Sequence, residues 1–172
     1  MKGRAIEYTR QLPVGWQQFG AYVVTLADRL GNRNLTSPGL AIKAGGSAIV
    51  KAGSAFKAML SDGKVGRSIA KGANTDMAAL SGTVVNATFN VFAFFIDGAG
   101  TLTSAMGVAG TTEALLTFPP VPAGKACIGY VLINPTGTGD FVGGTTALDD
   151  ATVVPGAVYV NITGPFDPTI IP

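Results

Sequence analysis

The stretch TVVNATFNVFAFFI, residues 83–96, decides the fold. Apolar residues occupy every second position from Val85 to Phe95, and after Asn90 the intervening positions become apolar as well. Alternation with a period of two is typical of a β-strand, and a strand that is apolar at every position is typical of one buried on both faces. The sequence therefore predicts one strand over residues 83–96 whose second half is buried on both sides.

Shorter strands are predicted on both sides of this stretch, at the spacing of roughly ten residues that is usual in sandwiches and barrels. Turns rich in Gly and Pro separate them, among them residues 61–64 and 97–100. The pattern predicts an all-β fold, an antiparallel β-sandwich or barrel-like domain. The strands are expected over residues 48–51, 55–60, 65–70, 101–108, 113–118, 126–134, 140–142 and 157–163.

The chain divides into three parts by composition. Residues 1–40 are predicted to form an N-terminal attachment arm, extended or partly helical: the apolar spacing over residues 19–30 fits a helix, and their β-rich composition leaves a strand open. Residues 32–39 are expected to be a loop. Residues 41–73 are expected to form a basic β-hairpin region, and residues 74–172 an acidic β-sandwich domain.

Charge follows a similar division. The formal net charge of +2 combines +8 in residues 1–72, from 11 basic and 3 acidic residues, with −6 in residues 73–172, from 1 basic and 7 acidic residues. Such asymmetry favours an interaction surface, so we expect the N-terminal half to dock on an acidic surface. The alternative is that the basic residues only solubilise one sheet face. Nucleic acid is not an expected partner, because the basic residues are spaced singly and most of the nine Phe lie in the acidic half.

The arm supplies the candidate contact residues. Trp16 is the obvious anchor, and two interpretations stay open for it: packing within its own chain, or insertion into a pocket of a partner. The candidate partner-binding residues are Arg4, Arg10, Trp16, Phe19, Tyr22, Arg29 and Arg33.

The composition disfavours catalysis. The chain has no His, which removes the commonest general base and the commonest metal ligand. Its single cysteine, Cys127, lies in an apolar stretch and is expected to be a small buried hydrophobe rather than a nucleophile. Asp140, Asp149 and Asp150 could gather around a cation, but capping of turns is the favoured interpretation. We therefore expect no enzyme, no catalytic or metal residues and no cofactor.

No membrane partner or secretory signal is expected either. The longest strictly apolar run, residues 91–96, is far shorter than a membrane-spanning helix requires. Glu7 and Arg10 interrupt the stretch where a signal peptide would carry its apolar region.

Five segments between residues 74 and 168 stand out together: TDMAALSGT (75–83), NVFAFF (90–95), FPPVPAGK (118–125), INPTGTG (133–139) and FVGGTTALDD (141–150). In their wording and composition, residues 74–168 resemble the structural proteins of tailed-bacteriophage particles, of the capsid-decoration (cement) or head-fibre kind.

This resemblance implies a role on the virion, often as a trimer, without an enzymatic site. Together with the charge division it predicts a non-enzymatic virion structural protein that binds and stabilises or decorates a phage capsid through its basic N-terminal half. The expected partner is the major capsid protein or another virion protein, and a homotrimer is the favoured oligomer. The protein would be made in the bacterial host cytoplasm and reside in the virion. The alternative is a receptor- or carbohydrate-binding β-module of a phage fibre.

Overall fold

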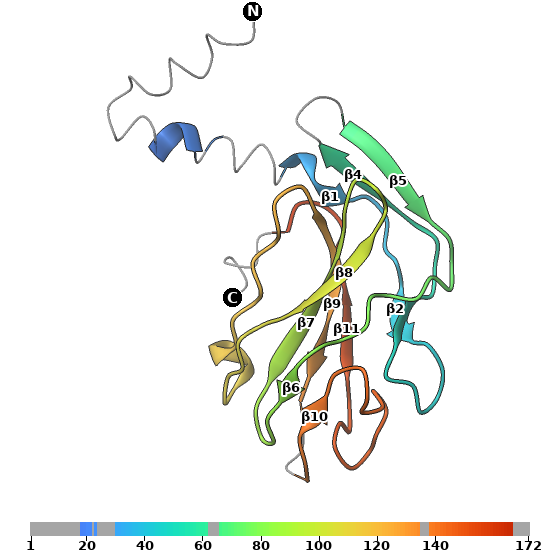
Figure 1. Ribbon diagram of the computed structural model, residues 1–172, viewed down its shortest axis with the longest axis vertical. Coiled ribbons are helices and arrows are strands. Elements are labelled where there is room, and N and C mark those ends of the chain that lie inside the picture. The colour runs from blue at the N-terminus through green and yellow to red at the C-terminus, as the bar shows by residue number, and fades with distance from the viewer. Residues whose placement is uncertain (1–17, 22, 24–29, 62–65, 135–137, 167–172) are drawn as a thin grey trace, which may run out of the picture.

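The computed structural model describes residues 18–21, 23, 30–61, 66–134 and 138–166 (Figure 1). The described residues form an all-β fold of several antiparallel sheets, sandwich-like and without a closed barrel among them, which confirms the predicted class. The elements are β1 (Arg33–Asn34), β2 (Leu40–Ile42), β3 (Val50–Ala52), β4 (Phe56–Ser61), β5 (Gly66–Lys71), β6 (Thr83–Val84), β7 (Asn90–Ile96), β8 (Leu102–Met106), the 3₁₀ turn η1 (Glu113–Leu115), β9 (Ala126–Ile133), β10 (Phe141–Val142) and β11 (Val158–Asn161).

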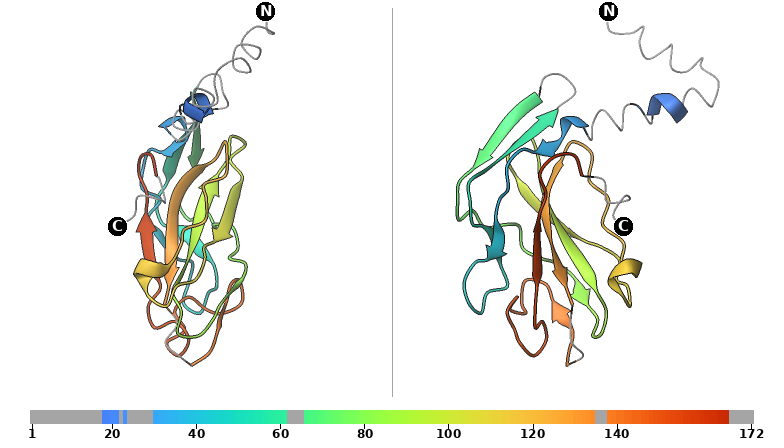
Figure 2. Two further views of the ribbon diagram at one scale, coloured as in Figure 1. Left: turned by 90° about the vertical axis from the view of Figure 1, so that its left-hand side faces the viewer. Right: turned by 180° about the vertical axis from the view of Figure 1, so that it is seen from behind.

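A four-stranded antiparallel sheet in the order β11-β9-β7-β8 forms one layer. Its strands lie side by side in the left panel of Figure 2. The central strand β7 is buried at every position, as the sequence predicts for residues apolar on both faces. Phe92, Phe94 and Ile96 point to the main core, whereas Ala93 and Phe95 belong to a smaller cluster on the opposite face, called the outer face below.

The second layer consists of smaller sheets. These are the three-stranded sheet β1-β4-β5 and the pairs β2–β3 and β10–β6. In Figure 1, β4, β5 and β2 lie to the right of the four-stranded sheet, and η1 lies to its left. Phe56, Ala58 and Leu60, at alternate positions of β4, meet the four-stranded sheet in the core. The residues of this core run from Leu40 to Val154 and come from both sides of the boundary expected between residues 73 and 74. That boundary separates the chain by charge and composition, whereas the two sides pack into one core.

The single strand expected over residues 83–96 is wrong at its centre. A turn separates β6 from β7: Ala87 has a φ of 59°, and the amide of Thr88 donates to the Val85 carbonyl at 3.1 Å. The backbone amide of Asn86 donates to the carboxylate of Asp140 at 2.8 Å. These bonds let the chain leave β6, which pairs with β10 in the second layer, and enter the four-stranded sheet as β7.

The strand expected over residues 113–118 is also wrong. Residues Glu113–Leu115 form the 3₁₀ turn, in which the amide of Leu115 donates to the Thr112 carbonyl at 3.1 Å. All three side chains are exposed, so no buried face stabilises a strand there. Gly110 makes the turn possible, because a Cβ on it would lie 2.5 Å from backbone atoms of Leu115 and Leu116.

The loop expected over residues 32–39 contains a short strand. β1 pairs with β4, with Asn34 opposite Ala58. Asn34 is fully buried, and its side-chain amide donates to the carbonyls of Ile162 at 2.7 Å and Thr36 at 2.9 Å. These residues are therefore part of the β body. Before them, residues 18–21, 23, 30 and 31 are helical, which agrees with the helical alternative for that segment.

The turn predicted at residues 97–100 is confirmed and joins β7 to β8. The carboxylate of Asp97 accepts the amides of Thr101 at 2.8 Å and Ala99 at 3.0 Å. The hydrogen bond from the Thr101 amide stabilises the charged carboxylate and holds the pKa of Asp97 below its ordinary value of 3.8. The hydrogen bond from the Ala99 amide lowers this pKa further, by a smaller amount. Gly100 closes the turn with a φ of 82°, a conformation that favours glycine.

Candidate interaction surfaces

The three-stranded sheet β1-β4-β5 gathers basic side chains. Arg33, Lys57, Arg67 and Lys71 belong to it, and none of the residues in these three described strands is acidic. Lys57 is exposed on β4 between the buried Phe56 and Ala58. We call these four residues the basic sheet.

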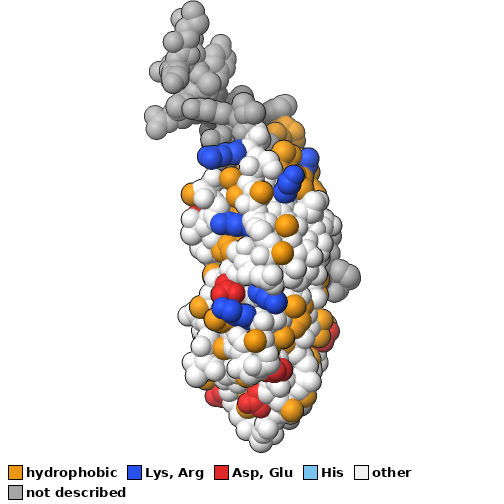
Figure 3. Space-filling view, turned by 90° about the vertical axis from the view of Figure 1, so that its right-hand side faces the viewer, with side chains coloured by type: hydrophobic (Ala, Val, Ile, Leu, Met, Phe, Trp, Pro, Cys, Tyr) orange, Lys and Arg blue, Asp and Glu red, His pale blue; other side chains and the backbone are white. Residues whose placement is uncertain are grey.

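Charge is separated along the length of the molecule. Figure 3 shows Lys and Arg side chains in the upper and middle parts of one face, and Asp and Glu side chains from the middle downward. The basic sheet lies at the upper end of Figure 1, whereas β10 and the loops that hold Asp140, Asp149 and Asp150 lie at the lower end. Asp97 departs from this separation, because its turn lies beside β5 of the basic sheet: a Cβ on Gly100 would lie 3.4 Å from the ammonium nitrogen of Lys71. The charge division of the sequence is therefore only partly kept in space.

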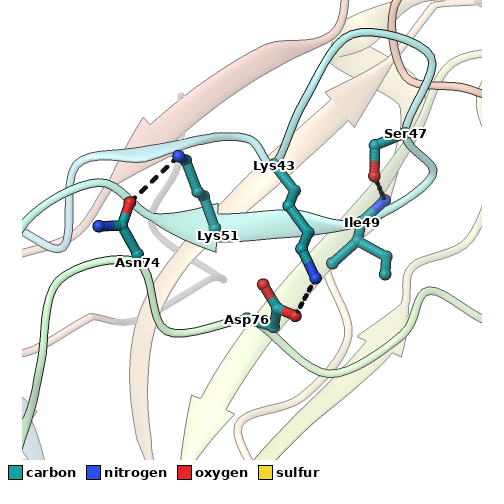
Figure 4. A network of polar contacts seen from close by, with 6 residues as sticks. All are labelled: Lys43, Ser47, Ile49, Lys51, Asn74 and Asp76. Carbon is teal, nitrogen blue, oxygen red and sulfur yellow. Dashed lines mark hydrogen bonds and ion pairs between the residues drawn. The ribbon is translucent and has the colours of Figure 1, made fainter.

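Two further lysines serve the fold. The ammonium of Lys43 forms an ion pair with Asp76 at 2.5 Å, and that of Lys51 donates to the side-chain oxygen of Asn74 at 3.1 Å (Figure 4). Residues 74–77 run beside β3, where the Met77 amide donates to the Val50 carbonyl at 2.8 Å. Lys43 and Lys51 thus fasten this segment to the β2–β3 hairpin.

Most of the candidate contact residues predicted from the sequence lie outside the described residues: Arg4, Arg10, Trp16, Tyr22 and Arg29. Phe19 is described and is 58% exposed, in the helical residues 18–21. Arg33 lies in β1, and its guanidinium donates to the Leu30 carbonyl at 3.1 Å. The structure therefore places Arg33 in the body of the protein rather than in an arm.

The sequence analysis did not single out Lys57, Arg67 and Lys71 as contact residues. A signal was present, because basic and small or apolar residues alternate along β4 and β5, as on a half-exposed sheet. Only the pairing of β4 with β5, in which Lys57 is opposite Ala70 and Arg67 is opposite Leu60, brings these side chains into one sheet.

Asp140, Asp149 and Asp150, for which the sequence left a cation site open, cap separate turns. Both carboxylate oxygens of Asp149 accept the Gly46 amide at 3.0 Å, and Asp150 accepts the amides of Thr152 at 2.9 Å and Val153 at 3.2 Å. Asp140 binds the Asn86 amide described above. Among the described residues, no three His, Cys, Asp or Glu side chains gather closely enough to hold a metal ion. The turn-cap interpretation fits these contacts.

Cys127 is buried on β9, and its thiol donates to the Gly129 carbonyl at 3.8 Å. Burial raises the pKa of this thiol to about 12, because the apolar surroundings disfavour the thiolate. The thiolate is the nucleophilic form of cysteine, so this position is chemically inert near neutral pH. The expectation of a buried hydrophobe is confirmed.

A pocket of about 300 Å³ opens on the outer face of the four-stranded sheet. Val91, Tyr130 and Leu132 form its floor, and residues 113–118 form one wall. The rings of Phe118, Tyr130 and Phe166 meet beside it, with centroids of the first two 4.8 Å apart. Desolvation raises the pKa of Tyr130, with smaller contributions from Cys127 and Glu113. Glu113 brings the one carboxylate of this pocket, whose other side chains are apolar or aromatic.

Comparison with known proteins finds no family model, no curated protein and no solved structure that matches the chain. Within the part of the chain that the structure describes, no helix is both long and apolar enough to span a membrane.

Proposed function

We propose that this chain is a non-enzymatic structural protein of a phage virion, which docks on the capsid shell through its basic N-terminal half and stabilises or decorates it. The partner is an acidic surface of the major capsid protein or of another virion protein. The protein acts as a homo-oligomer.

The observation that carries this proposal is the basic sheet. Four basic residues share three strands in which no described residue is acidic, at the end of the molecule opposite Asp140, Asp149 and Asp150. Arg33 and Lys57 lie on one face of this sheet, and Arg67 and Lys71, which are opposite Leu60 and Phe56, lie on the other. A surface of one sign raises the rate of encounter with a surface of the other sign and suppresses wrong partners. The capped carboxylates and the inert thiol of Cys127 support a binding role further, because the side chains best suited to chemistry are engaged in the fold.

Neutralising the basic sheet is expected to weaken shell binding. In the variant Lys57→Gln/Arg67→Gln/Lys71→Gln, three exposed or half-exposed charges are lost. At about 0.5 kcal/mol for each exposed charge, the dissociation constant rises about tenfold at low salt. Co-sedimentation of the full chain with bare capsid shells, over a salt series, measures this change. Raising the salt is expected to weaken wild-type binding and to narrow the gap between variant and wild type.

The matched control is Lys125→Gln, which removes the basic residue of the C-terminal, acidic part of the chain. It is expected to bind shells as the wild type does. Equal binding by the triple variant and the wild type at low salt would show that the basic sheet does not dock. The same conclusion would follow if Lys125→Gln weakened shell binding as much as the triple variant does.

A further inference from the structure

The strand β5 forms one edge of the three-stranded sheet β1-β4-β5. Within the described residues, its six residues pair with β4, and no strand pairs with its other side. The opposite edge of this sheet is partly closed, because Asn34 of β1 is bridged to Gly164. In Figure 1 and in the right panel of Figure 2, β5 lies at the outer side of the molecule. A free strand edge presents backbone donors and acceptors to another chain.

The hydrogen bonds of β4 show which of its backbone groups point towards β5. On the β1 side, the amide of Lys57 donates to the Thr36 hydroxyl at 2.8 Å, and the Lys57 carbonyl accepts the Leu35 amide at 2.7 Å. Backbone groups of successive residues point to alternate sides of a strand. The amide and carbonyl of Ala58, the next residue, therefore point to β5.

The outward backbone groups of β5 follow from this alternation. Ile69 is directly opposite Ala58, so its amide and carbonyl face β4. Those of its neighbours Ser68 and Ala70 then point away from β4, towards the free edge. Both residues are exposed, and no backbone hydrogen bond from another described residue reaches them on this side.

The side chains beside this edge have a definite pattern. Arg67, Ile69 and Lys71 lie on one face of β5, with the apolar residue between the two basic ones. In an antiparallel strand added to the edge, the residues opposite these three would form non-hydrogen-bonded pairs, in which side chains lie closest. The carboxylate of Asp97, in the turn beside Lys71, is already engaged with amides of its own turn.

We propose that β5 binds an extended acidic segment of the shell protein as an added antiparallel strand. The segment carries an acidic, an apolar and a second acidic residue at alternate positions, opposite Lys71, Ile69 and Arg67. This inference rests on the proposed function, which supplies the acidic partner, and it names how that partner is held. Backbone hydrogen bonds to Ser68 and Ala70 provide affinity, and the alternate side chains provide specificity.

The same charges oppose a second copy of β5 as the occupant. Two antiparallel copies centred on Ile69 would place Arg67 of each opposite Lys71 of the other. Like charges directly opposite each other destabilise a strand pair. Basic residues on an edge strand therefore discourage pairing between identical edges and leave the edge open to an acidic strand.

The test uses a blocked peptide of the matched pattern, Thr-Glu-Thr-Val-Thr-Glu-Thr, titrated into the isotope-labelled full chain without shells and followed by NMR. Binding is expected to saturate, and at saturation the amides of Ser68 and Ala70 are expected to exchange with solvent at least about tenfold more slowly. The control peptide has lysine in place of both glutamates. It is expected to bind at least about tenfold more weakly.

Two variants test the edge from the protein's side. Ser68→Pro removes an outward amide without taking a hydrogen bond from β4, so the fold is expected to persist, as urea unfolding checks. Its affinity for the matched peptide is expected to fall about tenfold. Ser68→Val keeps the amide and is the matched control, expected to bind as the wild type does. Arg67→Gln/Lys71→Gln keeps every backbone group and is expected to lower the affinity about fivefold.

Several results would overturn the strand site. These are no saturation by the matched peptide, equal binding of the two peptides, unchanged binding by both Ser68→Pro and Arg67→Gln/Lys71→Gln, or an equal loss in Ser68→Val. A wild-type mass of two chains that Ser68→Pro reduces to one would assign the edge to a second copy instead.

Co-sedimentation with bare shells separates this inference from the proposed function. Ser68→Pro is expected to bind shells more weakly than Ser68→Val. Equal shell binding by these two variants would overturn β5 as the shell contact, although the proposed function would stand. A wild type that fails to sediment with shells would overturn the shell protein as the source of the segment, whereas the strand site would still stand on the peptide result.

Discussion

Replacing Phe94 with alanine is expected to lower the free energy of unfolding by about 3–5 kcal/mol. Phe94 is fully buried near the middle of β7, the central strand of the four-stranded sheet. Its neighbours across the sheet are Ser104 on β8 and Gly129 on β9, and its side chain enters the core between the two layers. Neither neighbour is large enough to fill the space that the ring leaves, so the cavity persists and its cost adds to the lost burial.

Urea unfolding of the full chain, followed by circular dichroism, measures this loss. Leu115→Ala is the control, since Leu115 is 65% exposed and its truncation in the isolated chain is expected to cost less than about 0.5 kcal/mol. A loss below about 1 kcal/mol for Phe94→Ala would contradict the placement of this ring in the core.

Gly129→Ala is expected to lower the free energy of unfolding by about 2–3 kcal/mol through overpacking. A Cβ at this position would lie 2.5 Å from the Val160 carbonyl oxygen on β11 and 2.5 Å from a methyl carbon of Leu40. Gly129 also lies at the irregularity of the β7–β9 pairing, with a φ of 157°. The carbonyl belongs to a paired strand, so relief requires β11 to move away from β9.

The same urea experiment checks this prediction. Gly72→Ala is the matched control, because a Cβ there meets nothing within 4 Å, and its effect is expected to stay below about 0.5 kcal/mol. Equal midpoints of urea unfolding for Gly129→Ala and Gly72→Ala would mean that β9 and β11 do not lie as close together as described.

Local alternation predicted the strands whose burial repeats every second residue. β4 follows this rule, since its positions alternate between core and surface. β7 was predicted by the apolar run after Asn90, and it is buried at every position. The break between β6 and β7 was not predictable from the neighbouring residues alone, because it depends on the hydrogen bond from the Asn86 amide to Asp140, 54 residues away. The strand β1 likewise depends on the bond from Asn34 to the Ile162 carbonyl, 128 residues away.

The candidate surfaces were predictable only in their charge. The sequence divides into a basic and an acidic part, and that division survives in space except at the Asp97 turn, which lies beside Lys71. Which lysines remain for a partner depends on tertiary contacts: Lys43 and Lys51 bind Asp76 and Asn74 across the β2–β3 hairpin.

The central claim is that the basic N-terminal half attaches this protein to a capsid shell. A deletion tests it best if it ends at residue 29, because Asn34 and Leu40 are buried in the body and a deletion through residue 40 would damage the core. The most direct measurement is the amount of protein that sediments with bare shells, for the full chain and for the chain that lacks residues 1–29. We expect the full chain to saturate the shells at a fixed stoichiometry in low salt. The shortened chain keeps the basic sheet but loses Arg4, Arg10, Trp16 and Arg29, so it is expected to bind the shells less tightly than the full chain, and its unfolding in urea checks that it is folded. A full chain that does not sediment with shells, or a shortened chain that saturates them equally well, would contradict the account.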